Sequence, residues 1–348
     1  MKLSTRHHRA ITNPRIIAAV TAAGCATAIL AAGGTAAART GATPGPGQPD
    51  AAHAASPATT AAVANGRIAF SQGDLGPGGD LSGHSNVYTI NPDGTGRRQL
   101  THVGAAQAAG SPDWSPGGEK IVYVSNQTGD YRIWVMNANG SGQRRIADDP
   151  GFADLNPAWS PDGARILFSR CDDHIGFILS CDLEVMNAAG GGMHRLAGGH
   201  WIYARGQYSP DGQRIVVEAD RGGFQSALWV LRADGTGLHR ITRASLRAFW
   251  PDWSPDGRRV LFSDNCCQRG SNIWTVRPDG TELREVTHFS PRQDGAFGSY
   301  SPDARRIVLF YSGKCCRYFH VMNADGSGLH PVRTGVPNTF LTDWGPAR

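Results

Sequence analysis

Short runs of β-branched and aromatic residues alternate with tight-turn sequences along residues 65–348. Runs such as ARILF from Ala164 and RRVLF from Arg258 favour strands, because branched side chains pack well on a pleated sheet. Each run follows a segment similar to Trp-Ser-Pro-Asp-Gly, in which proline presets φ and glycine tolerates the left-handed exit of a turn. The pattern predicts an all-β chain of short strands joined by tight turns.

The turn sequence returns at a nearly constant interval. Its aromatic residue is found at Trp114, Trp159, Tyr208, Trp253, Tyr300 and Trp344. It alternates with a second type of turn, Asn/Asp-Gly, which starts at Asn91, Asn137, Asn187, Arg232, Arg277 and Asn323. The aromatic residues are 45, 49, 45, 47 and 44 residues apart, a period typical of one four-stranded propeller blade.

Each end of the repeat region holds only part of a blade. GRIAF from Gly66 is a second strand without a first, and FLTDWGPAR at 340–348 is a first strand without a second. We expect the two segments to pair and to close the ring, which removes an open sheet edge. The sequence therefore predicts a six-bladed β-propeller of four-stranded blades, closed by N-terminal strands that pair with the C-terminal strand.

The repeat resembles that of TolB-like six-bladed β-propellers, a WD-like family with a Trp-Ser-Pro-Asp-Gly repeat. Residues 154–163, DLNPAWSPDG, carry the family pattern D-x-x-P-x-W-S-P-D-G in full. The likeness covers residues 65–348 and is weakest in the Gly-rich stretch 71–86 and at the turn positions Gly117 and Ala304. The resemblance implies the propeller fold and a tendency to bind proteins or peptides, and it implies no reaction.

Residues 1–38 predict an export signal, with a basic start, an apolar run and an Ala-x-Ala type cleavage site. The sequence AAGC that ends at Cys25 resembles a lipoprotein signal, so three outcomes stay open: cleavage, lipid anchoring through Cys25 and a retained anchor. Each outcome places the rest of the chain outside the cytoplasm, either secreted or associated with the cell envelope. Residues 39–64, rich in Ala, Pro, Thr and Gly, predict a flexible linker before the propeller at 65–348.

The formal charge of +5 comes mainly from the export signal. Without residues 1–38, the chain has 30 basic and 29 acidic side chains. A near-neutral body argues against nucleic acid, which is bound through a basic surface that neutralises phosphates. We expect a protein or peptide partner in the cell envelope, or a glycan, with no membrane insertion beyond the N-terminal segment.

Sequence motifs for catalysis are absent: the chain has no G-x-S-x-G, H-E-x-x-H or Walker A string. His194, His239 and His330 occupy the same position in three repeats. This equivalence indicates that they belong to an outer strand of the repeat and have no catalytic role. We therefore expect a non-catalytic binding or scaffold module without a cofactor or metal site. The alternative is a propeller-type polysaccharide lyase or hydrolase, with a site at the channel mouth formed by residues that meet only in the fold.

Sequence variation is concentrated on one expected face of the ring, where the loops after each second and fourth strand emerge. One column, three residues before each turn aromatic, changes chemistry from blade to blade: Ser111, Asn156, Arg205, Trp250, Phe297 and Leu341. Aromatic side chains beside arginines suit a peptide, a glycan or a protein, and ordinary loop packing is the alternative. The candidate ligand-binding residues are Trp201, Arg205, Arg247, Trp250, Arg292, Asp294 and Phe297.

The six cysteines after the export signal lie in loops on this same face. Cys171 and Cys181 bracket one loop, and we predict a disulfide between them, as is usual outside the cytoplasm. Cys266-Cys267 and Cys315-Cys316 occupy matching loops of neighbouring blades. A vicinal disulfide joins Cα atoms only about 3.8 Å apart, which strains the bridge. Vicinal pairing, pairing between the two loops, and metal or redox chemistry all stay open.

Overall fold

The computed structural model describes residues 64–73, 84–172, 180–199, 201–220, 226–264, 270–290, 293–312, 317–332 and 339–347. The predicted export signal, the linker up to residue 63, Arg292 and the cysteines at 266, 267, 315 and 316 lie outside these residues. The elements of the described part are β-strands and one 3₁₀ helix, η1 (Ala244–Leu246). None of its helices has the length and apolar character needed to cross a membrane.

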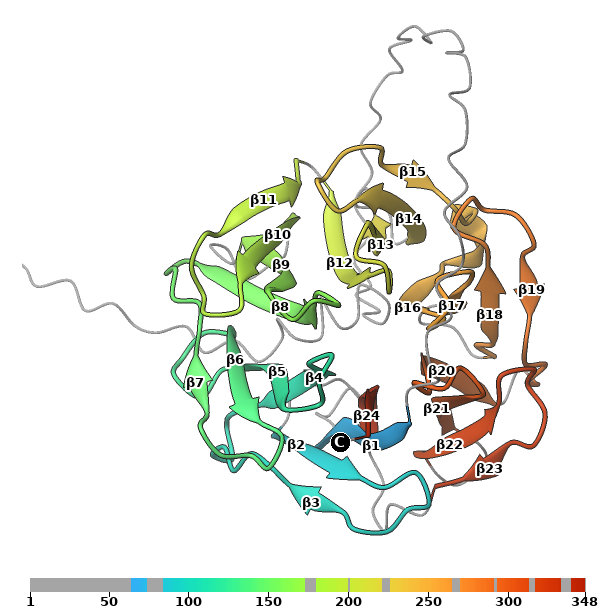
Figure 1. The fold of residues 1–348 in the computed structure, drawn as a ribbon, viewed down its shortest axis with the longest axis horizontal. Helices are drawn as coiled ribbons and strands as arrows, with labels where there is room; N and C mark the ends of the chain where they lie inside the picture. Colours follow the sequence, from blue (N-terminus) through green and yellow to red (C-terminus); the bar gives the residue numbers. More distant parts are fainter. Residues whose placement is uncertain are drawn as a thin grey trace, which may run out of the picture.

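The strands form a ring of small antiparallel sheets (Figure 1). The innermost strands contain the turn aromatics and are β4 (Ala109–Trp114), β8 (Phe152–Trp159), β12 (Ile202–Tyr208), β16 (Phe249–Trp253), β20 (Asp294–Tyr300) and β24 (Thr339–Pro346). The next strands outward are β5 (Lys120–Ser125), β9 (Arg165–Asp172), β13 (Arg214–Asp220), β17 (Val260–Ser263), β21 (Arg306–Ser312) and β1 (Asn65–Gly73). The third strands are β6 (Arg132–Asn137), β10 (Cys181–Asn187), β14 (Ala227–Arg232), β18 (Ile273–Val276), β22 (Arg317–Asn323) and β2 (Ser85–Ile90). The short outer strands are β7 (Arg144–Arg145), β11 (His194–Ala197), β15 (His239–Arg240), β19 (Arg284–Glu285), β23 (His330–Pro331) and β3 (Arg98–Gln99).

We number the blades along the chain: β4–β7 is blade 1, β8–β11 blade 2, β12–β15 blade 3, β16–β19 blade 4, β20–β23 blade 5, and β24 with β1–β3 blade 6. Blades 1, 4, 5 and 6 are separate four-stranded sheets. Blades 2 and 3 instead form one eight-stranded sheet, because Cys181 of β10 pairs in parallel with Ile202 of β12. Blades 6 and 1 are linked by a similar but isolated parallel bridge, between Ser85 of β2 and Ala108 next to β4, and remain separate sheets.

The ring closes through blade 6, where β24 pairs antiparallel with β1 and Trp344 lies opposite Ile68. The predicted all-β propeller and its closure by N-terminal and C-terminal strands are therefore confirmed. Buried apolar side chains hold neighbouring blades together, and across the closure Ile68 and Phe70 pack with Val308 and Phe319 of blade 5. Removing such surface from water contributes about 25 cal/mol per Å².

The turn between the first and second strands of a blade is built by its own serine and aspartate. In blade 4, Ser254 Oγ donates to Asp256 Oδ1 at 2.6 Å and accepts the Arg259 N–H at 2.9 Å. Gly257 follows with φ of 67°, a left-handed conformation that suits glycine. The same hydrogen bonds recur at Ser160, Ser209 and Ser301. Asp256 thus shapes a turn. The equivalent histidines His194, His239 and His330 lie exposed on outer strands.

Candidate functional site

The innermost strand of every blade contains a β-bulge at the variable column. Its pairing with the second strand shifts register there, for example between Gly110 and Asp113 in blade 1. Four column residues have a left-handed φ of 50–56° although none is glycine: Ser111, Asn156, Trp250 and Phe297. Because a bulge re-aims the side chain of its extra residue, the column is set apart from the regular alternation of the strand.

The bulge is held by the second strand of the preceding blade. The N–H of Ser111 donates to Ser71 Oγ at 3.1 Å, and the N–H of Phe297 donates to Ser263 Oγ at 3.1 Å. In blade 3 the equivalent position is Glu218, whose Oε2 accepts the N–H of Trp250 at 3.3 Å. Glu218 is only 6% exposed, so this blade places a buried acid where blades 6 and 4 use the neutral hydroxyls of Ser71 and Ser263.

Arg205 lies at the bulge of blade 3 and stacks on the next blade. Its guanidinium carbon is 3.8 Å from the centroid of the Trp250 ring, a short cation–π distance. Phe297 packs edge-on against the same tryptophan, with ring centroids 5.0 Å apart. Arg205 is 5% exposed, its buried Nε has no hydrogen-bond partner, and none of the described hydrogen bonds or ion pairs involves its guanidinium. The cation is therefore oriented by an aromatic ring, and its buried Nε–H has no acceptor within the protein.

Three aspartates reach the same region from other blades, each one residue before a turn aromatic. They are Asp113 of blade 1, Asp252 of blade 4 and Asp343 of blade 6. In each, Oδ2 accepts the backbone N–H of the turn aromatic of the next blade: Trp159 at 2.8 Å, Tyr300 at 2.8 Å and Trp114 at 2.7 Å, respectively. These bonds fix the carboxylates and tie consecutive blades together.

The charges interact across the centre of the ring, around which β4, β12, β16 and β24 are arranged (Figure 1). Gln207 Nε2 of blade 3 donates to Asp113 Oδ1 of blade 1 at 3.5 Å, which shows that side chains from non-adjacent blades meet there. We call Arg205, Gln207, Glu218 and the three aspartates the central cluster.

Burial controls the protonation of the central cluster. It raises the pKa of Asp252 to about 7 and the pKa of Glu218 to about 7. Burial also raises the pKa of Asp113, and the nearby charge of Asp343 raises it further. The charge of Arg205 lowers the pKa of each carboxyl by less than burial raises it. Four carboxyl groups thus surround one guanidinium, and burial raises the pKa of all four, to about 7 for Asp252 and Glu218.

The structure brings together three of the residues expected to bind a ligand: Arg205, Trp250 and Phe297. Trp250 does not present its ring to solvent, because it is 4% exposed beneath Arg205 and Phe297. Trp201 packs elsewhere, stacked on Tyr203 at 5.9 Å and edge-on to Trp229 of β14 at 5.0 Å. The described contacts of Trp201 therefore place it with the outer part of blade 3.

The other expected residues have local roles or fall outside the described part. Asp294 Oδ1 accepts the N–H of Gly270 at 2.7 Å and that of Ser271 at 3.4 Å, so it anchors a loop. Arg247 ends η1 in a left-handed conformation with φ of 46°. Arg292 lies outside the described residues.

The four acids of the central cluster were missed by sequence reasoning, although each leaves a signal. An aspartate stands directly before the turn aromatic in three of the six repeats. Glu218 occupies a column that holds Ser71, Ser169 and Ser263 in other blades. The position before the turn aromatic and the position of Glu218 both lie within strands of the repeat, where a buried acid is unusual.

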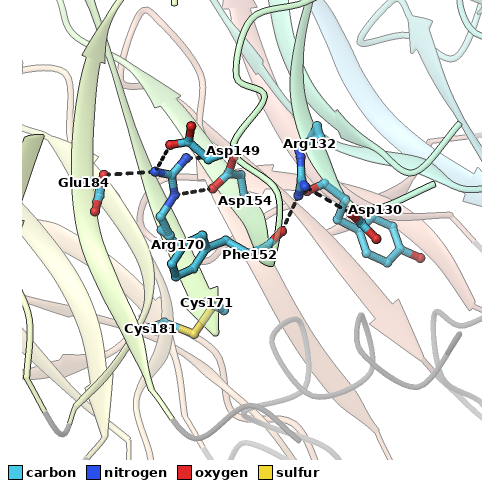
Figure 2. Close-up of polar contacts among 10 residues, drawn as sticks. Asp130, Arg132, Asp149, Phe152, Asp154, Arg170, Cys171, Cys181 and Glu184 are labelled. Atoms are coloured by element: carbon cyan, nitrogen blue, oxygen red, sulfur yellow. Dashed lines mark hydrogen bonds and ion pairs between the residues drawn. A yellow bond between two sulfur atoms is a disulfide. The ribbon is translucent and has the colours of Figure 1, made fainter. Parts of the chain in front are cut away.

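A second charged cluster surrounds Arg170 in blade 2 (Figure 2). Arg170 Nε donates to Asp154 Oδ1 at 2.8 Å, Nη1 donates to Asp149 Oδ2 at 2.7 Å, and Glu184 Oε2 lies 3.7 Å from Nη1. Next to it, Cys171 and Cys181 form a disulfide, which confirms that predicted pairing. The donors and acceptors of this cluster are used within it, so we regard it as structural. The described part of the chain contains no group of three His, Cys, Asp or Glu side chains able to hold a metal ion.

Comparison with known proteins adds the family context. A family model described as the TolB beta propeller domain matches residues 79–183 and 156–348. An uncharacterized protein of Agrobacterium fabrum is 33% identical over 137 residues, which make up 37% of this chain and 45% of that protein. The crystal structure of TolB from Acinetobacter baumannii superposes with a TM-score of 0.64 at 19% identity, covering 81% of this chain and 67% of that one. An oligogalacturonate lyase in complex with manganese gives a TM-score of 0.53 at 15% identity, with 72% and 71% covered. The match thus spans less than half of the Agrobacterium protein, and the two solved structures share the fold.

Proposed function

The chain belongs to the TolB beta propeller domain family, and from this premise we propose that it is an exported, non-catalytic binding module of the cell envelope. In this proposal the loop-rich face of the propeller holds a protein, a peptide or a glycan. The observation that carries the proposal is Arg205, a buried guanidinium oriented by Trp250, whose Nε–H has no partner in the protein. A buried donor without a partner is costly, so a ligand that supplies acceptors there gains affinity.

The choice of face follows from the contacts between loops. On the loop-rich face, Ala108 N–H donates to Asn126 Oδ1 at 2.7 Å, which fixes the loop after β5 to the segment before β4. On the opposite face the two kinds of tight turn meet, as where the Ala138 N–H donates to Glu119 O at 2.9 Å. The tight turns repeat in almost every blade, whereas the loops differ, and recognition usually resides in loops that a rigid scaffold positions.

Site-specific photo-crosslinking in cells that export the full chain tests this assignment. A photoreactive residue replaces Thr128 or His102 on the loop-rich face, or Arg258 on the turn face, and all three positions are exposed. We expect crosslinked adducts from Thr128 or His102 and none above background from Arg258. Adducts from Arg258 alone, or from none of the three positions, would contradict the proposal.

A second candidate function is a lyase or hydrolase that acts on a polysaccharide. It is favoured by Glu218 and Asp252, because a carboxyl with a pKa of about 7 suits a general base. Arg205 nearby suits a uronate carboxylate. The test is incubation of the full chain with polygalacturonate and other acidic polysaccharides. Product release that Glu218→Gln or Asp252→Asn abolishes would establish an enzyme, and no release from the wild-type chain would remove this candidate.

A further inference from the structure

We propose that the central cluster is a receptor for a zwitterionic group, with the ligand's carboxylate on Arg205 and its cationic group on Asp252 and Asp343. The inference rests on the proposed binding function and specifies its ligand chemistry. Two sources carry such a pair of charges: a free amino acid, and adjacent acidic and basic side chains of a peptide.

The carboxylate end is assigned to Arg205. A guanidinium presents five N–H donors in a rigid fork that matches a carboxylate in a bidentate manner. Stacking on Trp250 at 3.8 Å holds this fork in one orientation, and its buried Nε has no partner in the protein. Glu218 does not satisfy it by direct contact, because the described hydrogen bond of its Oε2 is to the N–H of Trp250.

The cationic end is assigned to Asp252 and Asp343. Both are half-buried, whereas Asp113 is 6% exposed, so they are the aspartates of the cluster that a ligand reaches more easily. Each is held through Oδ2 by a backbone N–H, at 2.8 Å for Asp252 and 2.7 Å for Asp343. A carboxylate fixed in this way needs little reorganisation when a cation binds.

A single charge fits the cluster poorly. An anion on Arg205 is repelled by the surrounding carboxylates, and a cation on the aspartates is repelled by the guanidinium. Inside a protein these interactions are stronger than in water, because the dielectric constant is lower and salt screens them less. A ligand that carries both charges replaces both repulsions with attractions.

Isothermal titration calorimetry of the full chain with glycine, β-alanine and γ-aminobutyrate tests the proposal and measures the preferred charge separation. Acetate and ethylamine carry the same groups singly and serve as matched probes. We expect at least one of the amino acids to bind about tenfold more tightly than either single-charge probe. Arg205→Gln and Asp252→Asn should each weaken that binding about tenfold. Arg243→Gln, an exposed arginine at the start of η1 and outside the cluster, should leave it unchanged.

A peptide pair distinguishes the two sources. Acetyl-Asp-Lys-amide carries both charges on its side chains, and acetyl-Asn-Lys-amide lacks the carboxylate. If only the first peptide binds and the free amino acids do not bind, the zwitterion is a pair of side chains and the proposal stands. Arg205→Lys keeps the positive charge but loses the forked donors, so its affinity should lie between those of the wild type and Arg205→Gln. Circular dichroism checks that each variant is folded.

Two results would overturn the inference. Ethylamine that binds as tightly as the amino acids, with no effect of Arg205→Gln, would show a site for cations only. The absence of binding by every zwitterionic probe would also overturn it. In that case, adducts from Thr128 or His102 would still support the proposed binding function, so the two failures are distinguishable.

Discussion

Arg205 and Trp250 belong to neighbouring blades, yet the guanidinium lies 3.8 Å from the centre of the indole ring and both residues are at least nine-tenths buried. The pair joins β12 to β16 next to the centre of the ring (Figure 1). A tryptophan in this position supports the arginine and does not itself form an exposed contact surface.

Replacing Trp250 with alanine should therefore destabilise the propeller by about 3–5 kcal/mol, the usual loss for a large buried aromatic side chain. Urea denaturation of the full chain measures the change in the free energy of unfolding. Trp201→Ala is the matched control and should lose less, because Trp201 is only half-buried. Equal losses in the two variants would contradict the burial of Trp250.

The stability of the propeller should depend on pH through Asp252 and Glu218. Burial raises both pKa values to about 7 in the folded protein, above the ordinary 3.8 and 4.5. The folded state therefore holds these protons more tightly than the unfolded state. As a result, their contribution to the free energy of unfolding is largest at low pH. It falls between about pH 4 and pH 7 and stays constant above about pH 7.

Asp252→Asn keeps an acceptor for the Tyr300 N–H but removes the titration, so it should flatten this decline, as should Glu218→Gln. Denaturation curves at several pH values between about 4 and 8 measure the slope. Turn aspartates act in the opposite direction and at lower pH. The Ser160 hydrogen bond lowers the pKa of Asp162, so its contribution is lost only as the pH falls below about 4. If neither Asp252→Asn nor Glu218→Gln changes the slope of stability against pH, Asp252 and Glu218 are not the groups that cause the decline.

Arg170→Met should cost about 3–5 kcal/mol, because it leaves Asp154 fully buried without a cation. The double variant Arg170→Met/Asp154→Leu should recover most of the loss, since it removes both charges together. Arg145→Met breaks the more exposed pair with Asp148 and should cost less than about 1 kcal/mol. A double variant no more stable than Arg170→Met would show that the cluster contributes through its shape and not through its charge (Figure 2).

Reduction of the Cys171–Cys181 disulfide should lower the free energy of unfolding by about 2–3 kcal/mol, as expected for a short closed loop. The melting temperature with and without dithiothreitol measures the effect. The Cys171→Ala/Cys181→Ala variant should already show the lower value, and any further drop on reduction would report the remaining cysteines. A wild-type chain insensitive to dithiothreitol would contradict the bridge.

Much of the fold was predictable because its causes are local and repeated. The serine and aspartate of the turn at Ser254 and Asp256 bond to each other, so the same short sequence makes the same turn in several blades. The incomplete repeats at the two ends predicted the β1–β24 pairing, and a shared loop predicted the Cys171–Cys181 bridge. The joining of blades 2 and 3 through Cys181 and Ile202 was not foreseen, since it depends on how closely two backbones approach.

The sequence by itself determined the blade period, the turns, the closure of the ring and the column at which blades differ. Only the tertiary structure decided what that column does. Trp201 and Trp250 both lie shortly before a turn aromatic, but Trp201 packs on Trp229 of its own blade, whereas Trp250 lies beneath Arg205 of the preceding blade. Asp113, Asp252 and Asp343 are separated by 91 or more residues in the chain, and closure of the ring places them around one guanidinium. Local sequence sets the conformation of a strand, whereas the charges that surround a side chain depend on distances between blades.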